Sequence, residues 1–420
     1  MKNLGAVILL FLANTISGIA QGISMIAIPW YFTQQGESNV FGYIYLAITF
    51  TALFWSPTAG TFVDRFSRKS IFMVLTVVSG CIVSLVAYAG HSMEHLPLAL
   101  AGLVFAITFF NYNLHYPTLY SFLQEITEPR LYGRITSAVE VQGQLSSVLA
   151  GAGAAMLLEG LPDGKITLFG QLVQLPFSFE AWTLYEIFAL DALTYFAAFG
   201  FIAFIRYESL TERDQEKGSV WKRLTVGFQW LKEHPYIFLF GVVSFAVFVG
   251  VLMTPFYLAA KYVEAHLKMG GDVYAASEIF YASGAILSGL LIRRVFRGMH
   301  IIKSIIIMMF LGAALFAVLA LSRSALMMYI MFLILGISNA GIRIQRVTFL
   351  FRVIPNQVYG RANSILGLSH IIWRVFFLMI FGLPFFHEGN NVIYGFVILS
   401  FFITASAGVL VGYYRKLVRL

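Results

Sequence analysis

The sequence predicts an all-α, polytopic membrane protein with twelve membrane-spanning helices in two pseudo-symmetric six-helix bundles. Three observations predict this class: the composition, the number of long apolar segments, and the distribution of Lys and Arg. Of 420 residues, 59% are hydrophobic and 11% are charged, whereas soluble domains carry about 25% charged residues. Because a soluble fold lacks the interior to bury so much apolar surface, we expect lipid to be the main solvent.

Long apolar segments account for most of the chain. A helix needs about 20 apolar residues to cross the bilayer, and lipid requires each segment to satisfy its own backbone hydrogen bonds. The first segment is longer than a signal-peptide core and is expected to be retained as a span. The predicted spans are 5–32, 40–62, 71–90, 97–121, 135–158, 182–205, 236–260, 272–292, 300–321, 325–350, 362–385 and 391–413.

The basic residues predict the topology. With both termini in the cytoplasm, 21 of the 28 Lys and Arg residues lie on the cytoplasmic side and 4 lie outside. Such an excess of positive charge is typical of cytoplasmic loops. It predicts a multi-pass protein of a bacterial-type inner (plasma) membrane, and it explains the net charge of +8 without a nucleic-acid partner.

The chain is expected to divide into a first bundle (1–206), a cytoplasmic linker (207–235) and a second bundle (236–420). Apolar residues of the linker recur at helical spacing, which predicts an amphipathic helix on the inner leaflet. The outward segment 159–180 alternates apolar and polar residues, which favours a small hairpin cap. The single cysteine, Cys81, leaves no intramolecular disulfide.

Two patterns recur in the two halves. The segment Gly60–Lys69 reads GTFVDRFSRK, and Gly289–Arg297 reads GLLIRRVFR 229 residues later. Likewise Tyr132–Ser137 reads YGRITS, and Tyr359–Ser364 reads YGRANS 227 residues later. Matching positions in each half predict a duplicated architecture.

The first of these segments resembles the loop signature of the major facilitator superfamily, G-x-x-x-D-R-x-x-R followed by Lys or Arg. The subgroup that the chain most resembles contains macrolide efflux proteins and the enterobactin exporter, with support from Asp191 in ALDAL, the run Glu278–Gly284 and the Gly-Arg-x-x-Ser pattern at Arg361. The resemblance covers the whole chain. It implies a monomeric transporter of a small molecule, working by alternating access in the lipid bilayer, with no cofactor or metal.

In this family the loop latches the cytoplasmic side in the outward-facing state. Physically, the loop needs a small residue for close helix packing and a carboxylate that meets an arginine or a helix N-terminus. Arg134 is the expected partner of Asp64, and a merely solvated run of charges is the alternative. The expected gating residues are Gly60, Asp64, Arg65, Arg68, Arg134 and Arg361.

Charged residues within spans are costly, so each is a functional candidate. Arg343 and Arg374 are expected to bind an anionic portion of the substrate, because guanidinium suits carboxylate and phosphate. The alternative is that they form structural ion pairs with Glu140 or Asp191. Arg346 lies three residues from Arg343, on the same face, and is expected to extend to the inner headgroups.

Polar residues of the first half supply further candidates. Asn14 and Gln21 lie seven residues apart on one face of the first span and are expected to contact substrate. Glu140 is either a cavity carboxylate or the partner of a cytoplasmic arginine. His115 is a candidate because histidine titrates near neutral pH, whereas His370 is expected to be hydrogen-bonded core.

Two acids are candidates for ion coupling. Asp191 lies at mid-depth in the sixth span, as either a structural residue or a proton carrier, and Glu278 lies near the outer end of the eighth span, as a gate or a coupling acid. The fourth span carries Asn111, Asn113 and His115 where many proton-coupled relatives have an arginine. The resemblance therefore supports the fold more strongly than it supports a coupling proton.

The leading functional expectation is efflux of a small amphipathic, drug- or siderophore-like molecule, coupled to protons. The alternative, which the arginines favour, is uptake or export of an anionic metabolite such as a carboxylate siderophore or a lysophospholipid. The direction of transport stays open. An intramembrane enzyme is a remote alternative, because the sequence has no H-E-x-x-H, G-x-S-x-G or Walker motif. A channel is equally remote, because no K⁺-filter motif is present.

Overall fold

The computed structural model describes residues 4–128, 131–161, 164–168, 171–174, 176, 178–206 and 220–420. Within these residues, twelve helical segments are long and apolar enough to cross a membrane. The predicted all-α class and the predicted number of spans are confirmed. Side chains such as Leu85, Leu193 and Phe401 are exposed on these helices, as expected where lipid is the solvent.

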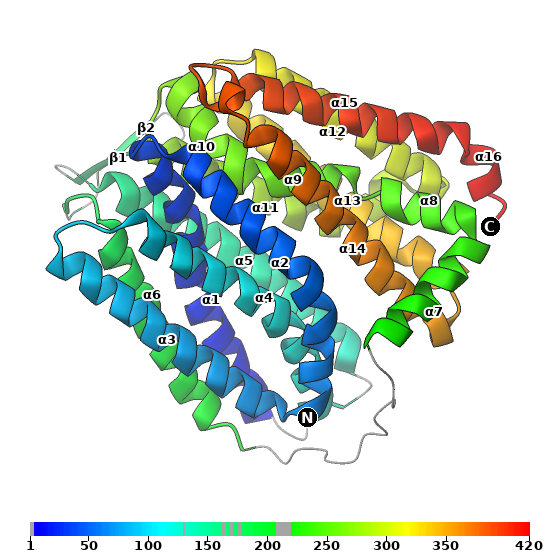
Figure 1. The fold of residues 1–420 in the computed structure, drawn as a ribbon, viewed down its shortest axis with the longest axis horizontal. Helices are drawn as coiled ribbons and strands as arrows, with labels where there is room; N and C mark the ends of the chain where they lie inside the picture. The colour runs from blue at the N-terminus through cyan, green and yellow to red at the C-terminus, as the bar shows by residue number, and fades with distance from the viewer. Residues whose placement is uncertain are drawn as a thin grey trace. The chain divides into compact units, whose positions relative to one another are not determined.

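Eleven of the twelve spans each lie on one helix (Figure 1). These helices are α1 (Leu4–Gln34), α2 (Ser38–Arg65), α3 (Arg68–Ser92), α4 (Leu98–Ile126), α5 (Tyr132–Glu159), α6 (Leu184–Ala203), α11 (Gly271–Val295), α12 (Ile301–Leu321), α13 (Ala325–Val353), α14 (Asn356–Phe381) and α15 (Val392–Gly412). Two shorter helices, α7 (Val220–Glu233) and α16 (Tyr414–Leu417), lie outside the spans.

The seventh span is interrupted. It consists of α8 (Pro235–Val243), a break at Ser244 and Phe245, α9 (Ala246–Met253), a π-helical turn (Thr254–Leu258), α10 (Ala259–Lys261) and a second π-helical turn (Tyr262–Leu267). Pro255 explains the first π turn, because proline has no N–H to donate to the α-helical ladder. The span ends at Lys268, whose φ of 55° is left-handed. It therefore extends beyond the predicted end at residue 260.

The described chain forms two compact units. The first unit contains 1–37, 54–216 and 270–279, and the second contains 38–53, 217–269 and 280–420. Each unit therefore takes most of one half of the sequence together with a short stretch of the other half.

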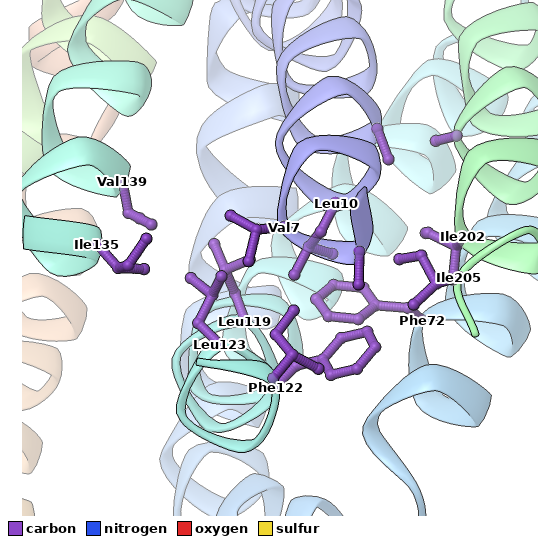
Figure 2. Packing of buried hydrophobic residues seen from close by; sticks show 14 residues of the cluster. Val7, Leu10, Phe72, Leu119, Phe122, Leu123, Ile135, Val139, Ile202 and Ile205 are labelled. Carbon is purple, nitrogen blue, oxygen red and sulfur yellow. The ribbon is translucent and has the colours of Figure 1, made fainter. Parts of the chain in front are cut away.

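In the first unit, α1 packs against α4, α5 and α6, and α3 packs against α4 and α6. Phe72, Phe122 and Ile202 belong to an apolar cluster that α1, α3, α4, α5 and α6 all contribute to (Figure 2). The cluster lies at the start of α1, α3 and α5 and at the end of α4 and α6. These are the ends that the distribution of Lys and Arg predicts to face the cytoplasm. The labelled members are Val7, Leu10, Phe72, Leu119, Phe122, Leu123, Ile135, Val139, Ile202 and Ile205.

The link between α5 and α6 contains a small hairpin. Strands β1 (Lys165–Leu168) and β2 (Gln171–Gln174) are antiparallel, with Lys165 opposite Gln174. The hairpin predicted within 159–180 is confirmed. Helix α6 then begins with a capping box, in which the Thr183 backbone N–H donates to Glu186 Oε2 at 2.7 Å.

In the second unit, α12 packs against α13 and α15, and α11 crosses α13 closely. A Cβ at Gly284 would meet the backbone of Leu333, and a Cβ at Gly336 would meet the backbone of Tyr281. Such close approach through small residues is a main source of stability between helices in lipid, where no hydrophobic effect drives them together.

Helix α7 forms within the predicted linker helix and packs on α14. Its Leu231 is fully buried, and a Cβ on Gly227 would clash with the backbone of Arg361. The expectation that the apolar face lies on the leaflet is therefore wrong for Leu231, because protein rather than lipid covers this side chain. Phe228 remains 50% exposed.

Candidate functional site

A polar network joins α1, α4 and α5 inside the first unit. His115 Nε2 lies 2.7 Å from Asn14 Oδ1, and Asn14 Nδ2 donates to Gln142 Oε1 at 3.1 Å. Gln142 Nε2 donates in turn to the Phe11 carbonyl at 2.7 Å and to Thr15 Oγ1 at 2.5 Å. The structure thus brings two predicted site residues, Asn14 and His115, into direct contact and adds Gln142.

The network borders a small cavity of about 30 Å³. Gln21, which donates to Ser17 Oγ, lines this cavity together with Asn14 and His115. A volume of this size holds one or two waters. The apolar cluster contributes Leu10, Phe72, Leu119 and Ile202 to the wall, so the polar layer ends where that cluster begins.

Asp191 lies on α6, fully buried against α1. Its Oδ2 accepts a hydrogen bond from Ser24 Oγ at 2.9 Å, and its Oδ1 has no hydrogen-bond partner among the described residues. Tyr195, one helical turn further, lines the cavity beside Asn111. In the described part of the chain no cation pairs with Asp191, so one donor alone offsets the burial of its carboxyl group.

Glu278 lies in the stretch of α11 that belongs to the first unit. Its Oε1 is buried without a hydrogen-bond partner among the residues that the structure describes. One turn earlier on α11, the ring of Tyr274 stacks on Trp30 of α1, with centroids 6.1 Å apart. Glu278 is therefore a second acid held in an apolar and aromatic setting.

The second unit contains a buried cationic cluster at the break in the seventh span. The guanidinium carbon of Arg346 lies 3.6 Å from the centroid of Phe245, and its Nη1 donates to the Ser244 carbonyl at 3.1 Å. The ring of His370 also stacks on Phe245, with 5.1 Å between the two centroids. The Nδ1 atom of His370 has no hydrogen-bond partner within the described ranges. Arg346 is 5% exposed, so the expectation that it extends to the headgroups is wrong.

Arg374 lies one turn after His370 on α14 and is also 5% exposed. Its guanidinium carbon lies 5.6 Å from the centroid of Tyr45, which α2 contributes to the second unit. Arg343 is exposed. Arg343 and Arg346 are three positions apart, so their side chains point about 60° apart around the helix axis. This difference is enough to leave Arg343 exposed while Arg346 is buried.

Tyr359, just before the span on α14, faces the same charge. Burial raises the pKa of Tyr359, and the Arg346 guanidinium opposes this shift by favouring the phenolate. The charge of Arg346 therefore acts electrostatically at the start of α14.

The described part of the predicted gate is a set of contacts within the first unit. Arg68 Nε lies 3.3 Å from Glu125 Oε1 and donates to Ser121 Oγ at 3.0 Å. Lys69 Nζ donates to the carbonyls of Ala203 and Ile205, at 2.9 and 2.7 Å. These two cations therefore tie the start of α3 to the ends of α4 and α6.

The structure describes the remaining predicted gating residues and Glu140 only in part. Arg361 is half-buried, and its backbone lies against Gly227 of α7. The positions of Gly60, Asp64, Arg65, Arg134 and Glu140 fall on helices, but their side chains lie outside the described residues.

The sequence profile of the Major Facilitator Superfamily matches residues 10–377. The chain belongs to the major facilitator superfamily. This membership makes it a multi-pass membrane transporter of small molecules rather than an enzyme.

Known major facilitators resemble the chain in fold and, over a shorter stretch, in sequence. The nucleoside transporter NupG has a TM-score of 0.71 at 12% identity, covering 97% of this chain and 99% of that one. A bacterial homologue of the iron transporter ferroportin, in an inward-facing state, has a TM-score of 0.70 at 14% identity, covering 96% and 98%. At these identities the likeness shows the fold alone.

The multidrug efflux pump Tap of Mycobacterium tuberculosis (strain ATCC 25618 / H37Rv) is 32% identical over 105 residues, 24% of this chain and 25% of Tap. Tap of Mycobacterium bovis (strain BCG / Pasteur 1173P2) matches to the same extent. The alignment spans about a quarter of the length of these relatives. The resemblance to a drug-efflux subgroup is thus supported by sequence.

Sequence reasoning missed several residues that contact the predicted ones. Gln142 and Ser24 are uncharged, so nothing in their spacing distinguishes them from ordinary span residues. Glu125 was detectable, because it is an acid just past the predicted end of the fourth span. Phe245 required the structure, since the break at Ser244 contains neither glycine nor proline.

Proposed function

We propose that this major facilitator is a secondary active transporter that exports a small amphipathic molecule carrying an anionic group, in exchange for protons. It would act as a monomer in a bacterial-type inner membrane, with both termini in the cytoplasm and with 1–206 and 236–420 as the moving halves joined by 207–235. The partial similarity to the Tap efflux pumps supports efflux.

The observation that carries the proposal is the cationic cluster, whose two charges are the guanidinium groups of Arg346 and Arg374, with the ring of His370 beside them. Burying a guanidinium without a carboxylate costs several kcal/mol, and among the described residues no carboxylate pairs with Arg346. A ring face and one carbonyl hold its charge instead. An anionic substrate group would supply the missing counter-charge, as a bidentate partner that guanidinium favours.

The break at Ser244 and Phe245 supports the same location. Transporters commonly bind substrate where a spanning helix is discontinuous, because the freed backbone groups and the side chains around them line the site. Here the carbonyl of Ser244 is at the break, and Arg346 already reaches it. Arg343, exposed one turn away, is proposed to meet the substrate first.

For coupling, we assign the proton to Asp191, with Glu278 as the second candidate. A buried carboxyl group with a single donor and no cation is suited to bind and release a proton. Asn14, Gln21, His115 and Glu140 are proposed as polar contacts or relay groups on the same unit. Gly60, Asp64, Arg65, Arg68, Arg134 and Arg361 are proposed to gate.

A matched pair of probes tests the substrate class. Pyrenebutyrate and its amide differ in charge but hardly in shape, and their binding to the reconstituted protein is measured by fluorescence. The proposal predicts that the acid binds at least about tenfold more tightly than the amide, and that Arg374→Gln removes this preference. Equal affinity for both probes, in wild type and variant alike, would overturn the anionic substrate.

The cluster also favours the second candidate, uptake or export of an anionic metabolite such as a carboxylate siderophore or a lysophospholipid. Right-side-out and inside-out vesicles that are given the same anion in the external medium distinguish the directions. Accumulation in inside-out vesicles alone supports efflux, whereas accumulation in right-side-out vesicles supports uptake.

A further inference from the structure

A second cavity lies in the second unit, and its lining includes no residue of the cationic cluster. It has a volume of about 490 Å³ and opens between the end of α11, the start of α12 and the end of α13. The ends that border it are those that the charge distribution places at the cytoplasm.

The mouth of this cavity is cationic. Arg297 and Arg352 lie on it, both are exposed, and in the part of the chain that the structure describes neither pairs with a carboxylate. The first turn of α12, from Ile301 to Ser304, also faces it. A helix of 21 residues presents the positive end of its dipole there.

The interior differs from the mouth. Ile292, Phe296 and Ile344 provide apolar walls, and the buried Ser304 hydroxyl pairs with Gln345. Gly298, at φ +80°, turns the chain sharply so that α11 and α12 enclose the space. Two arginines over an apolar lining match the two ends of a lipid: an anionic headgroup at the surface and the beginning of an acyl chain below it.

We infer that this cavity binds the phosphate-bearing headgroup of an anionic lipid from the leaflet at that face, with Arg297 and Arg352 contacting the phosphate. The apolar walls favour a lipid over a soluble phosphate ester. Only a lipid has an acyl chain that buries apolar surface against Ile292, Phe296 and Ile344. The lining shares no residue with the substrate cluster, so the lipid proposal can be tested independently of the transport proposal.

The test uses the purified full-length protein, stripped of lipid in a neutral detergent, and native mass spectrometry with added phosphatidylglycerol, phosphatidylcholine or glycerol 3-phosphate. Phosphatidylglycerol is expected to bind more tightly than phosphatidylcholine, and glycerol 3-phosphate is not expected to compete. The Arg297→Ala/Arg352→Ala double variant is expected to bind phosphatidylglycerol about thirtyfold more weakly, since each basic residue near an anionic headgroup contributes about a factor of five.

Two further variants make the result specific. Arg415→Ala/Arg419→Ala removes two exposed charges near the C-terminus, and it is expected to leave the affinity within about twofold. Thr348 lines the cavity, so Thr348→Phe fills it without removing charge and is expected to weaken binding as the arginine variant does. Unchanged binding in either cavity variant, an equal loss in the Arg415/Arg419 control, or full competition by glycerol 3-phosphate would each overturn the lipid site.

Discussion

The guanidinium of Arg346 lies directly over the ring of Phe245, 3.6 Å from its centroid, while the same group donates to the carbonyl of Ser244. Both partners lie at the break in the seventh span. A cation–π contact contributes about 2 kcal/mol when desolvated, which offsets only part of the cost of burying the charge. The arrangement holds a cation ready for an anion that the protein itself does not provide in its described part.

Replacing Arg346 by Gln is therefore expected to weaken binding of an anionic substrate about tenfold to a hundredfold, because one charge-assisted contact contributes about 1.5 to 3 kcal/mol. The loss should be much smaller for an uncharged analogue of the same shape. Binding to reconstituted protein measures both. Arg323→Gln, which changes an exposed arginine just before the other end of α13, serves as the control; equal losses in the two variants would contradict the assignment.

Asp191→Asn is expected to abolish transport driven by a pH gradient and to retain exchange of labelled for unlabelled substrate. The amide preserves the shape of the side chain and a partner for Ser24 but cannot release a proton. Measuring both activities in the same proteoliposomes separates coupling from folding. If gradient-driven transport persists in this variant, Asp191 is structural, and Glu278→Gln is then the variant to measure.

Breaking the pair of Arg68 and Glu125 should destabilise the first unit. Glu125→Gln leaves a buried arginine with Ser121 and the Phe66 carbonyl, and the expected loss in the free energy of unfolding is about 3 to 5 kcal/mol. A double-mutant cycle with Arg68→Gln, followed by thermal unfolding in detergent, gives the coupling. Additive effects of the two substitutions would show that the contact contributes nothing.

The close crossing of α11 and α13 predicts that adding a single methyl group at a glycine of the crossing destabilises the protein. Gly336→Ala places a Cβ against the backbone of Tyr281 and should lower the free energy of unfolding by about 1 to 3 kcal/mol. Gly289→Ala on α11, where nothing lies within 4 Å of the added Cβ, should be neutral or stabilising by up to about 1 kcal/mol. A melting temperature that falls equally in both variants would argue against close packing at this crossing.

Much of the fold was predictable, because a helix that crosses lipid is recognisable in the sequence from its length and hydropathy. Each span has to be long and apolar, so hydropathy alone located all twelve, and alternation of apolar and polar residues located the hairpin of β1 and β2. The break at Ser244 was not predictable, because no glycine or proline marks it. Its partner Arg346 lies 102 residues away in sequence.

The candidate site was predicted in its residue types rather than in its contacts. In-span charges identified Asp191, Arg374 and the pair on α13, since the cost of burying charge makes each of them unusual. Which of Arg343 and Arg346 is buried depends on how α13 is rotated against its neighbours. The hydrogen bonds of Asn14 with His115 and Gln142 likewise depend on packing that no local pattern records.

Proton movement coupled to an anion tests the account most directly. Proteoliposomes containing the wild-type protein and an internal pH-sensitive dye are given an outward-directed gradient of an anionic amphiphile that binds in the probe screen. The account predicts that the internal pH falls as the anion leaves, and that the change disappears in Asp191→Asn and in Arg346→Gln while persisting in Arg323→Gln. Anion efflux with no accompanying change in internal pH would contradict it.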